Sequence, residues 1–363
     1  MLDRVRRMRA DPPAIARRRR SFDGVPARVR RPLNSCRGNE LTETLPRTPS
    51  HVVIVGAGIM GCDIAAIFLS AGCRVDCLSR DGSRRAERSE RIARSVGQLG
   101  GEFHSEHLRQ METYDDVAWE VAELVVETVP ENLELKRAVF AEIEARTGDD
   151  VPVASNASGL PISEIAKGLS LQHRALGLHF FLPAHLVPLV EVVRGAETDP
   201  AFVQLVHEMM LALGRVPVKV NRDTPGFLAN RIQHALMREA FAVLDEGLAS
   251  PEDVDAAVRY GFGMRYVAAG PLLQKEFAGL DTQLAAARSI YPALCGASMP
   301  SRTLCDLVGQ GRLGTKTLSG FWSWTPETAK AVKEEYEQAL LAALELVRRP
   351  AVTLRSTTEI EPS

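Results

Sequence analysis

Residues 51–61 read His-Val-Val-Ile-Val-Gly-Ala-Gly-Ile-Met-Gly. The apolar run at 52–55 has the pattern of a strand that is buried on both faces. Three glycines in G-x-G-x-x-G spacing follow it at once, and residues 62–71 have the composition of a helix that ends at Gly72. Residues 74–78 then predict a second strand. The stretch therefore predicts a strand, a tight turn, a helix and a neighbouring strand.

This context makes a common glycine spacing specific for dinucleotide binding. The glycines allow the tight turn, let the backbone approach a pyrophosphate and let the helix close on the strand. The helix N-terminus then faces the phosphates. The alternative is a glycine-rich turn in some other α/β domain. The predicted cofactor contacts in this turn are Gly56, Gly58, Ile59, Met60 and Gly61.

The end of the second strand bears on the choice of cofactor. NAD-binding proteins usually place a carboxylate there, roughly 20 residues past the glycines, to bind the ribose 2′-hydroxyl. This chain has Ser79 and Arg80, with Asp81 only afterwards. A serine and an arginine would accept a 2′-phosphate that a carboxylate repels. We predict NAD, with NADP possible from Ser79 and Arg80; alternatively Arg80 is solvated and Asp81 serves NAD.

Apolar runs and helical patterns alternate up to about residue 220, which predicts an α/β fold with a doubly wound, mostly parallel sheet. After residue 224 the apolar residues recur at helical spacing, which predicts helix upon helix. The predicted parts are an extension at 1–50, a dinucleotide-binding domain at 51–222, a smaller all-helical domain at 223–345 and a tail at 346–363.

Composition narrows the class of protein. The 45% apolar and 25% charged fractions are those of an ordinary soluble globular protein. No run of about 18 apolar residues predicts a membrane span. Six cysteines without a C-x-x-C pair fit reduced thiols in a cytoplasmic protein. We expect that the protein does not bind a membrane.

Residues 1–50 contain 13 Arg and five acidic residues, so the rest of the chain is mildly acidic. An acidic body argues against nucleic acid as the main partner. The basic segment lacks apolar periodicity, and we expect it to be disordered. A basic arm and a transit peptide are weaker interpretations than an extension without a folded role, because the segment has no interleaved aromatics and does contain acids.

Residues 177–193 place a histidine, His179, at the end of one apolar run and a carboxylate, Glu191, inside the next. Burying Glu191 among aliphatic side chains costs several kcal/mol unless a partner meets it. His179 is the nearest candidate, and a carboxylate that fixes the tautomer of a histidine strengthens it as a base. The alternative is a core histidine and an unrelated glutamate.

The chain resembles the L-3-hydroxyacyl-CoA dehydrogenases and their relatives, the L-gulonate 3-dehydrogenase (lambda-crystallin) and L-carnitine dehydrogenase group. The resemblance covers about residues 51–325 and rests on separated stretches in the right order. Besides the glycine turn and the residues around His179 and Glu191, these stretches are Val-Pro-Glu-Asn-Leu-Glu-Leu-Lys at 129–136, Ser-Asn-Ala-Ser-Gly-Leu-Pro-Ile at 155–162, Asp-Thr-Pro-Gly-Phe-Leu-Ala-Asn-Arg at 223–231 and Gly-Thr-Lys-Thr-Leu-Ser-Gly-Phe at 314–321.

The resemblance implies a Rossmann-type fold and a catalytic set. It makes His179 the general base and Glu191 the carboxylate that orients it. Ser158 would hydrogen-bond the reacting oxygen, with Asn230 as a further polar contact. The alternatives are that Ser158 only caps a helix and that Asn230 only braces one.

The resemblance also implies that Glu131 and Lys136 line the nicotinamide-ribose end of the site, although Lys136 could be a solvated helix residue. It implies a homodimer and a 3-hydroxyacyl-CoA substrate, as in fatty acid metabolism. A free 3-hydroxy acid or an aromatic alcohol is the alternative substrate. A crystallin-like structural or NAD(P)-sensing protein is the alternative without catalysis.

One segment departs from the family's pattern. The acyl-CoA enzymes carry a long helical hairpin after the second strand that contributes to the CoA site, and residues 80–123 leave room only for a shorter version. No His/Cys/Asp cluster has metal-ligand spacing, so no metal is predicted. The histidines at 104, 107, 173 and 185 have no matching partners, and surface or loop roles suffice for them.

Overall fold

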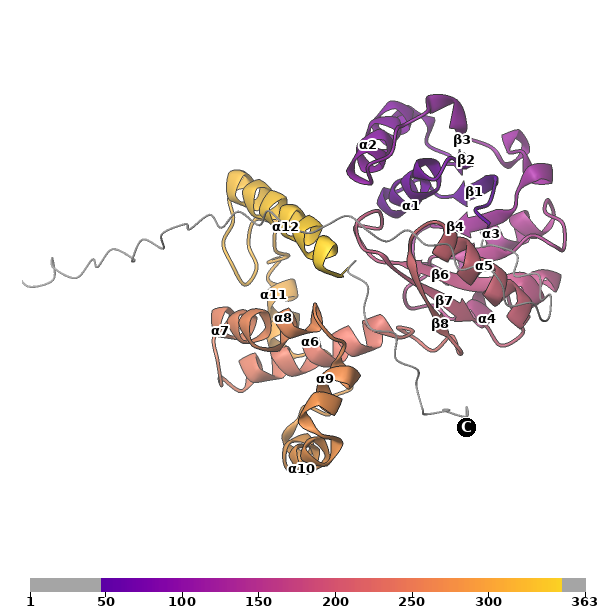
Figure 1. The fold of residues 1–363 in the computed structure, drawn as a ribbon. Helices are drawn as coiled ribbons and strands as arrows, with labels where there is room; N and C mark the ends of the chain where they lie inside the picture. Colours follow the sequence, from indigo (N-terminus) through magenta and orange to yellow (C-terminus); the bar gives the residue numbers. More distant parts are fainter. Residues whose placement is uncertain (1–46, 348–363) are drawn as a thin grey trace, which may run out of the picture. The chain divides into compact units, whose positions relative to one another are not determined.

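The structure is a computed structural model that describes residues 47–347. The predicted disorder of residues 1–50 therefore concerns a segment of which only residues 47–50 are described, and the predicted tail likewise lies almost entirely outside the described part. Strands and helices alternate between residues 51 and 220 (Figure 1). The strands form one eight-stranded sheet in the order β3-β2-β1-β4-β5-β6-β7-β8.

Every neighbouring pair in this sheet is parallel except β6 with β7. The predicted doubly wound, mostly parallel sheet is thus confirmed. Strand β1 lies between β2 and β4, as a dinucleotide-binding unit requires. The strands are β1 (His51–Val55), β2 (Arg74–Leu78), β3 (Leu108–Met111), β4 (Leu124–Glu127), β5 (Val153–Ser155), β6 (Ala175–Phe180), β7 (Leu189–Arg194) and β8 (Val216–Val220).

Helices cover both faces of the sheet, which explains why the central strands are continuously apolar. Side chains alternate along β1, so Val52 and Ile54 belong to one hydrophobic core and Val53 and Val55 to the other. Helices α1 (Ile59–Ser70), α2 (Arg85–Gln98) and α5 (Pro200–Ala212) pack into the first core. Helices α3 (Leu133–Glu144) and α4 (Ile162–Ile165) pack into the second.

The connection from β2 to β3 contains α2 and short 3-10 turns, with no second α-helix. The shortened connection expected from the sequence is therefore a single helix of 14 residues. Its apolar residues Ile92 and Val96 are fully buried in the first core, where α2 packs against α1. No helical hairpin projects from this connection, all of which is described.

The C-terminal part is all-helical, as predicted. Helices α6 to α10 and α12 have no buried side chain, and α11 buries only Leu307. None of the helices between residues 47 and 347 has the length and apolar character to cross a membrane. The helices are α6 (Ala229–Asp245), α7 (Pro251–Ala256), α8 (Met264–Tyr266), α9 (Pro271–Ala278), α10 (Leu280–Ile290), α11 (Arg302–Gly309) and α12 (Pro326–Val347), with a π-helical turn at Ala257–Gly263.

Candidate active site

The turn between β1 and α1 has the geometry that its glycines predict. Gly56 has a φ of +105°, and a Cβ there would lie 2.9 Å from the backbone carbon of Thr128. A Cβ on Gly61 would lie 2.0 Å from the carbonyl oxygen of Gly56, so only glycine lets α1 close on β1. A Cβ on Gly58 would meet nothing within 4 Å. Gly58 therefore borders open space, where a phosphate could approach the start of α1.

A cavity of about 1160 Å³ opens beside this turn. Its lining comes from the carboxyl ends of β1, β2, β4, β5 and β6 and from the first turns of α6. This is where open α/β sheets bind ligands. The sequence-predicted residues that line it are Gly56, Gly58, Ile59, Met60, Ser79, Arg80, Ser158, His179 and Asn230. Gly61 is buried beneath the turn instead.

His179 and Glu191 face each other across the single antiparallel pair of the sheet. The Nδ1 atom of His179 lies 2.8 Å from Oε2 of Glu191, and both side chains are buried. A carboxylate can only accept at this contact, so Nδ1 carries the proton and Nε2 is left as the acceptor. Because His179 also lines the cavity, the arrangement can take a proton from a bound hydroxyl.

The other oxygen of Glu191 caps helix α6. Its Oε1 accepts hydrogen bonds from the backbone N–H groups of Leu228, at 3.1 Å, and Ala229, at 2.6 Å. Leu228 is the N-cap residue and has no side-chain cap of its own. The positive end of the helix dipole thus stabilises the ionised carboxylate. One buried glutamate therefore orients the histidine and fixes the start of α6, which carries Asn230.

Two aromatic rings flank the imidazole of His179. The Phe181 ring centroid is 4.4 Å away, and the Phe227 ring meets it edge-on at 5.7 Å. Phe227 is buried and has a φ of +48°, which is unusual for a phenylalanine. The backbone is held there by the turn before α6, where the Phe227 N–H bonds the carbonyl of Thr224. The rings exclude water from one side of the base.

Asn156 is a cavity residue that the sequence analysis did not single out. It follows β5, and its Oδ1 accepts a hydrogen bond of 2.9 Å from the backbone N–H of Phe180. This contact links the end of β5 to the residue after His179. An asparagine directly after a buried strand, two residues before Ser158, was the available signal.

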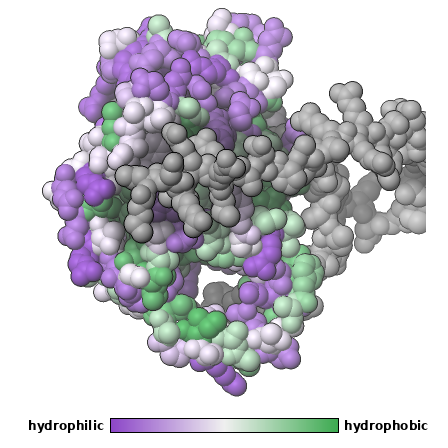
Figure 2. Space-filling view, turned by 90° about the vertical axis from the view of Figure 1, so that its left-hand side faces the viewer, coloured by the Kyte–Doolittle hydropathy of each residue, from purple (hydrophilic) through white to green (hydrophobic). Residues whose placement is uncertain are grey.

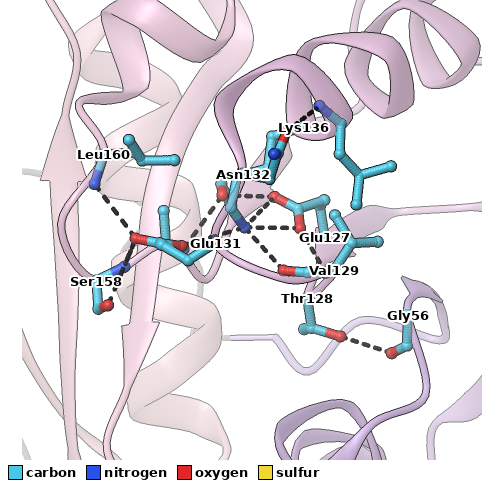
Figure 3. Close-up of polar contacts among 12 residues, drawn as sticks. Gly56, Glu127, Thr128, Val129, Glu131, Asn132, Lys136, Ser158 and Leu160 are labelled. Atoms are coloured by element: carbon cyan, nitrogen blue, oxygen red, sulfur yellow. Dashed lines mark hydrogen bonds and ion pairs between the residues drawn. The ribbon is translucent and has the colours of Figure 1, made fainter. Parts of the chain in front are cut away.

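Glu131 and Lys136 are not among the residues that line the cavity. Figure 3 shows the polar contacts that these two side chains make instead. Oε1 of Glu131 accepts hydrogen bonds from the backbone N–H groups of Ser158, at 3.0 Å, and Gly159, at 2.8 Å. Burial alone would raise the pKa of Glu131, but these backbone donors and the Lys136 ammonium outweigh it and hold the pKa below its usual range. Glu131 therefore holds the loop that carries Ser158.

Lys136 is 1% exposed, so it is not a solvated helix residue. Its Nζ lies 2.9 and 3.0 Å from the two carboxylate oxygens of Glu127 and 3.1 Å from the carbonyl of Val129. Burial raises the pKa of Glu127 despite this partner and the hydroxyl of Ser155. The pair lies under the site, where it supports the chain between β4 and α3.

His185 lies in the loop between β6 and β7, as one of the two expected roles has it, but it is not on the surface. His185 is buried, with Nδ1 at 3.3 Å from a carboxylate oxygen of Asp63 and Nε2 at 2.7 Å from the side-chain oxygen of Gln98. It ties the loop after β6 to helices α1 and α2. Within residues 47–347, no group of three or more His, Cys, Asp or Glu side chains could hold a metal ion.

Two family models match the chain in succession. The model of the 3-hydroxyacyl-CoA dehydrogenase NAD binding domain matches residues 51–224, and that of the C-terminal domain of the same family matches residues 226–324. Together they cover most of the chain, including every cavity residue named above.

Curated relatives and solved structures agree with these matches. The 5-formyl-3-hydroxy-2-methylpyridine 4-carboxylate 5-dehydrogenase of Mesorhizobium japonicum is 31% identical over 80% of this chain and 96% of its own length. The 3-hydroxyadipyl-CoA dehydrogenase of Escherichia coli is 34% identical over 77% of this chain and 60% of its own length. Among solved structures, a crystal structure of a 5-formyl-3-hydroxy-2-methylpyridine 4-carboxylic acid 5-dehydrogenase, described as an NAD+ dependent dismutase, matches with a TM-score of 0.78. It is 29% identical, and the match covers 82% of this chain and 98% of that chain.

Proposed function

Because the chain belongs to the 3-hydroxyacyl-CoA dehydrogenase family and is an NAD-dependent oxidoreductase, we propose that His179 and Glu191 carry its proton transfer. The supporting observation is the 2.8 Å contact between the two side chains at the wall of the cavity. The substrate is a small molecule that carries a hydroxyl group.

The glycine turn fits the cofactor. Gly58 leaves open space before α1, and the cavity is large enough for a dinucleotide beside a small substrate. Gly56, Gly58, Ile59 and Met60 would hold the pyrophosphate. When bound, NAD supplies the acceptor for the hydride of the substrate carbon.

His179 and the residues around it transfer the proton, orient the base and bind the reacting oxygen. Nε2 of His179 takes the hydroxyl proton as the C–H bond breaks and the carbonyl forms. Glu191 keeps the imidazole in the required tautomer and stabilises the imidazolium that results. Ser158 and Asn230 donate to the reacting oxygen. The phenyl rings of Phe181 and Phe227 keep water from the base.

For the substrate, we favour a free, small aromatic or 3-hydroxy acid over a 3-hydroxyacyl-CoA. The single helix between β2 and β3 supports this choice, since the resemblance assigns part of the CoA site to a longer hairpin there. The Mesorhizobium japonicum relative, which the match covers over 96% of its own length, acts, by its name, on a pyridine carboxylate. The 3-hydroxyadipyl-CoA dehydrogenase among the relatives supports the acyl-CoA alternative and a role in fatty acid metabolism.

A substrate panel tests this choice. We expect NADH oxidation with free keto or formyl acids to exceed that with acetoacetyl-CoA by at least about tenfold in kcat/KM, because no hairpin is there to bind CoA. The panel pairs aromatic and aliphatic free acids with acetoacetyl-CoA. A preference for acetoacetyl-CoA would establish the alternative substrate, and turnover of none would count against the proposed function.

We also propose that the chain is a homodimer whose C-terminal helices form the interface. The helices α6 to α10 bury no side chain within one chain, although they carry many apolar residues. Figure 2 shows hydrophobic surface between hydrophilic regions on the face it views. The most exposed large apolar side chains of these helices are those of Leu272, Phe277, Met264, Leu280 and Ile232. So much apolar surface marks an interface.

Sedimentation of the purified chain should give twice the chain mass at micromolar concentration. Phe277→Glu, at a position 74% exposed in one chain, should dissociate this dimer because it would bury a charge in the interface. Leu211→Glu on α5, 47% exposed, is the matched control and should stay dimeric. A monomeric wild type would refute the dimer.

A cytoplasmic location stays a prediction.

A further inference from the structure

We propose that the adenosine end of the cavity accepts a 2′-phosphate, so that the chain binds NADPH as well as NADH. This inference rests on the proposed dehydrogenase function and concerns the same cavity. It assigns a phosphate-binding role to Ser79 and Arg80 at the end of β2, with Arg88 behind them.

Ser79 occupies the position at which a carboxylate would exclude NADP. It follows β2 directly, its N–H bonds the carbonyl of Met111 at 2.9 Å, and it lines the cavity. A carboxylate here would bind the ribose 2′-hydroxyl and repel a phosphate. The hydroxyl of Ser79 carries no charge and can donate to a phosphate oxygen. The position therefore tolerates either group.

A buried arginine lies behind this hydroxyl. Arg88 is 8% exposed, and its guanidinium donates to Oγ of Ser79 at 3.2 Å and to the carbonyl of Asp81 at 2.8 Å. Within residues 47–347, no carboxylate lies within ion-pair distance of Arg88, and its Nε has no hydrogen-bond partner. A buried cation without a counter-ion is costly. An anion beside Ser79 would lower that cost.

Arg88 also sets the direction of the serine proton. Since Oγ of Ser79 accepts from Arg88, its own hydrogen is left to donate toward the cavity. Arg88 is thus a positioning residue that acts through Ser79. A 2′-phosphate would receive one hydrogen bond from Ser79 and the field of the guanidinium behind it.

Arg80 adds a cation at the cavity wall. It lines the cavity and is exposed, and among the described residues it makes no hydrogen bond or ion pair. Its neighbours on the same segment are engaged elsewhere: Arg84 bonds Glu87 at 2.7 Å, and Arg85 bonds Glu112 at 3.0 Å. Arg80 is therefore the cation of this segment that is available to a phosphate.

Asp81 follows Arg80 directly and lines the cavity, so its carboxylate could oppose a phosphate. Its Oδ1 accepts hydrogen bonds from the N–H and the hydroxyl of Ser83, at 3.0 and 2.5 Å, and so caps the turn Gly82–Arg84. These bonds from Ser83, more than the nearby arginines, hold the pKa of Asp81 below its usual range. One oxygen of the Asp81 carboxylate is thus engaged in the turn, whereas Ser79 occupies the position directly after β2.

Calorimetric titration of the full-length wild type with NADH and with NADPH tests the inference. We expect the Kd for NADPH to lie within about tenfold of that for NADH, because Ser79 and Arg80 offset the added charge. A Kd for NADPH more than about tenfold weaker would overturn the inference. If neither cofactor bound, the proposed function would fail instead.

Single substitutions test which residues are responsible for NADPH binding. Arg80→Ala should weaken NADPH binding by about tenfold and NADH binding by less than about twofold. Ser79→Asp should weaken NADPH by about a hundredfold and leave NADH as tight or tighter. Arg84→Ala, which removes a nearby arginine outside the cavity, is the matched control and should change neither. An equal loss of both cofactors in Arg80→Ala would overturn the assignment.

Discussion

His179→Asn is expected to lose about three orders of magnitude in kcat while its Kd for NADH stays within about twofold of the wild type. Asparagine can still donate to Oε2 of Glu191, which the imidazole contacts at 2.8 Å, so the carboxylate keeps a partner. It has no basic nitrogen to take the hydroxyl proton. The loss should therefore fall on turnover rather than on folding or cofactor binding.

The control is His104→Asn, which changes an exposed histidine outside the cavity and should keep full activity. Thermal unfolding of both variants checks that the fold survives. Turnover within about tenfold of the wild type in His179→Asn would remove the base assignment.

Glu191→Gln separates the orienting role from that of the base. The amide can still accept from the N–H groups of Leu228 and Ala229, so α6 should keep its cap. It cannot stabilise the imidazolium, because it has no charge. We expect a loss of kcat smaller than in His179→Asn.

The sequence predicted the dyad because the contact is local. His179 and Glu191 lie on adjacent strands joined by a short connection, and their apolar neighbours fix which face each side chain takes. The glycine turn was predictable from its G-x-G-x-x-G spacing between a strand and a helix, although the approach of Thr128 to Gly56 joins distant residues. Both predictions needed only short stretches of chain.

Other features depend on contacts that no short stretch contains. The burial of His185 requires Asp63 and Gln98 from two helices that precede it by many residues. The sequence predicted helices after residue 224, but not that their apolar side chains would stay exposed within one chain. The sequence did not predict that Glu191 caps α6 either, because these contacts join β7 to residues 37 and 38 positions later in the chain.

Lys136→Met is expected to lower the free energy of unfolding by about 3–5 kcal/mol, the usual cost of removing one member of a buried ion pair. The Lys136 ammonium donates to both carboxylate oxygens of Glu127 and to the Val129 carbonyl, which uses all three of its hydrogens. Ser155 and the N–H of Val129 complete the hydrogen bonds of the carboxylate. Methionine would leave Glu127 buried without a cation.

The loss should grow with pH. Burial already raises the pKa of Glu127, and removal of Lys136, which opposes this, would raise it further. A carboxyl whose pKa is higher in the folded state than in the unfolded state binds its proton more tightly when folded. Its contribution to stability is therefore fully present at low pH and is lost as pH rises through the folded pKa. Urea unfolding at pH 5 and pH 8 should show the larger loss at pH 8.

The double variant Glu127→Gln with Lys136→Met removes both charges and should recover part of the loss, because no buried ion is then left unpaired. The same variants show whether Lys136 has a structural role or contacts the cofactor. If Lys136 lies beneath the site, as its 1% exposure indicates, the stable double variant should bind NADH within about threefold of the wild type. A large loss of NADH affinity in Lys136→Met with an unchanged free energy of unfolding would instead make Lys136 a cofactor contact.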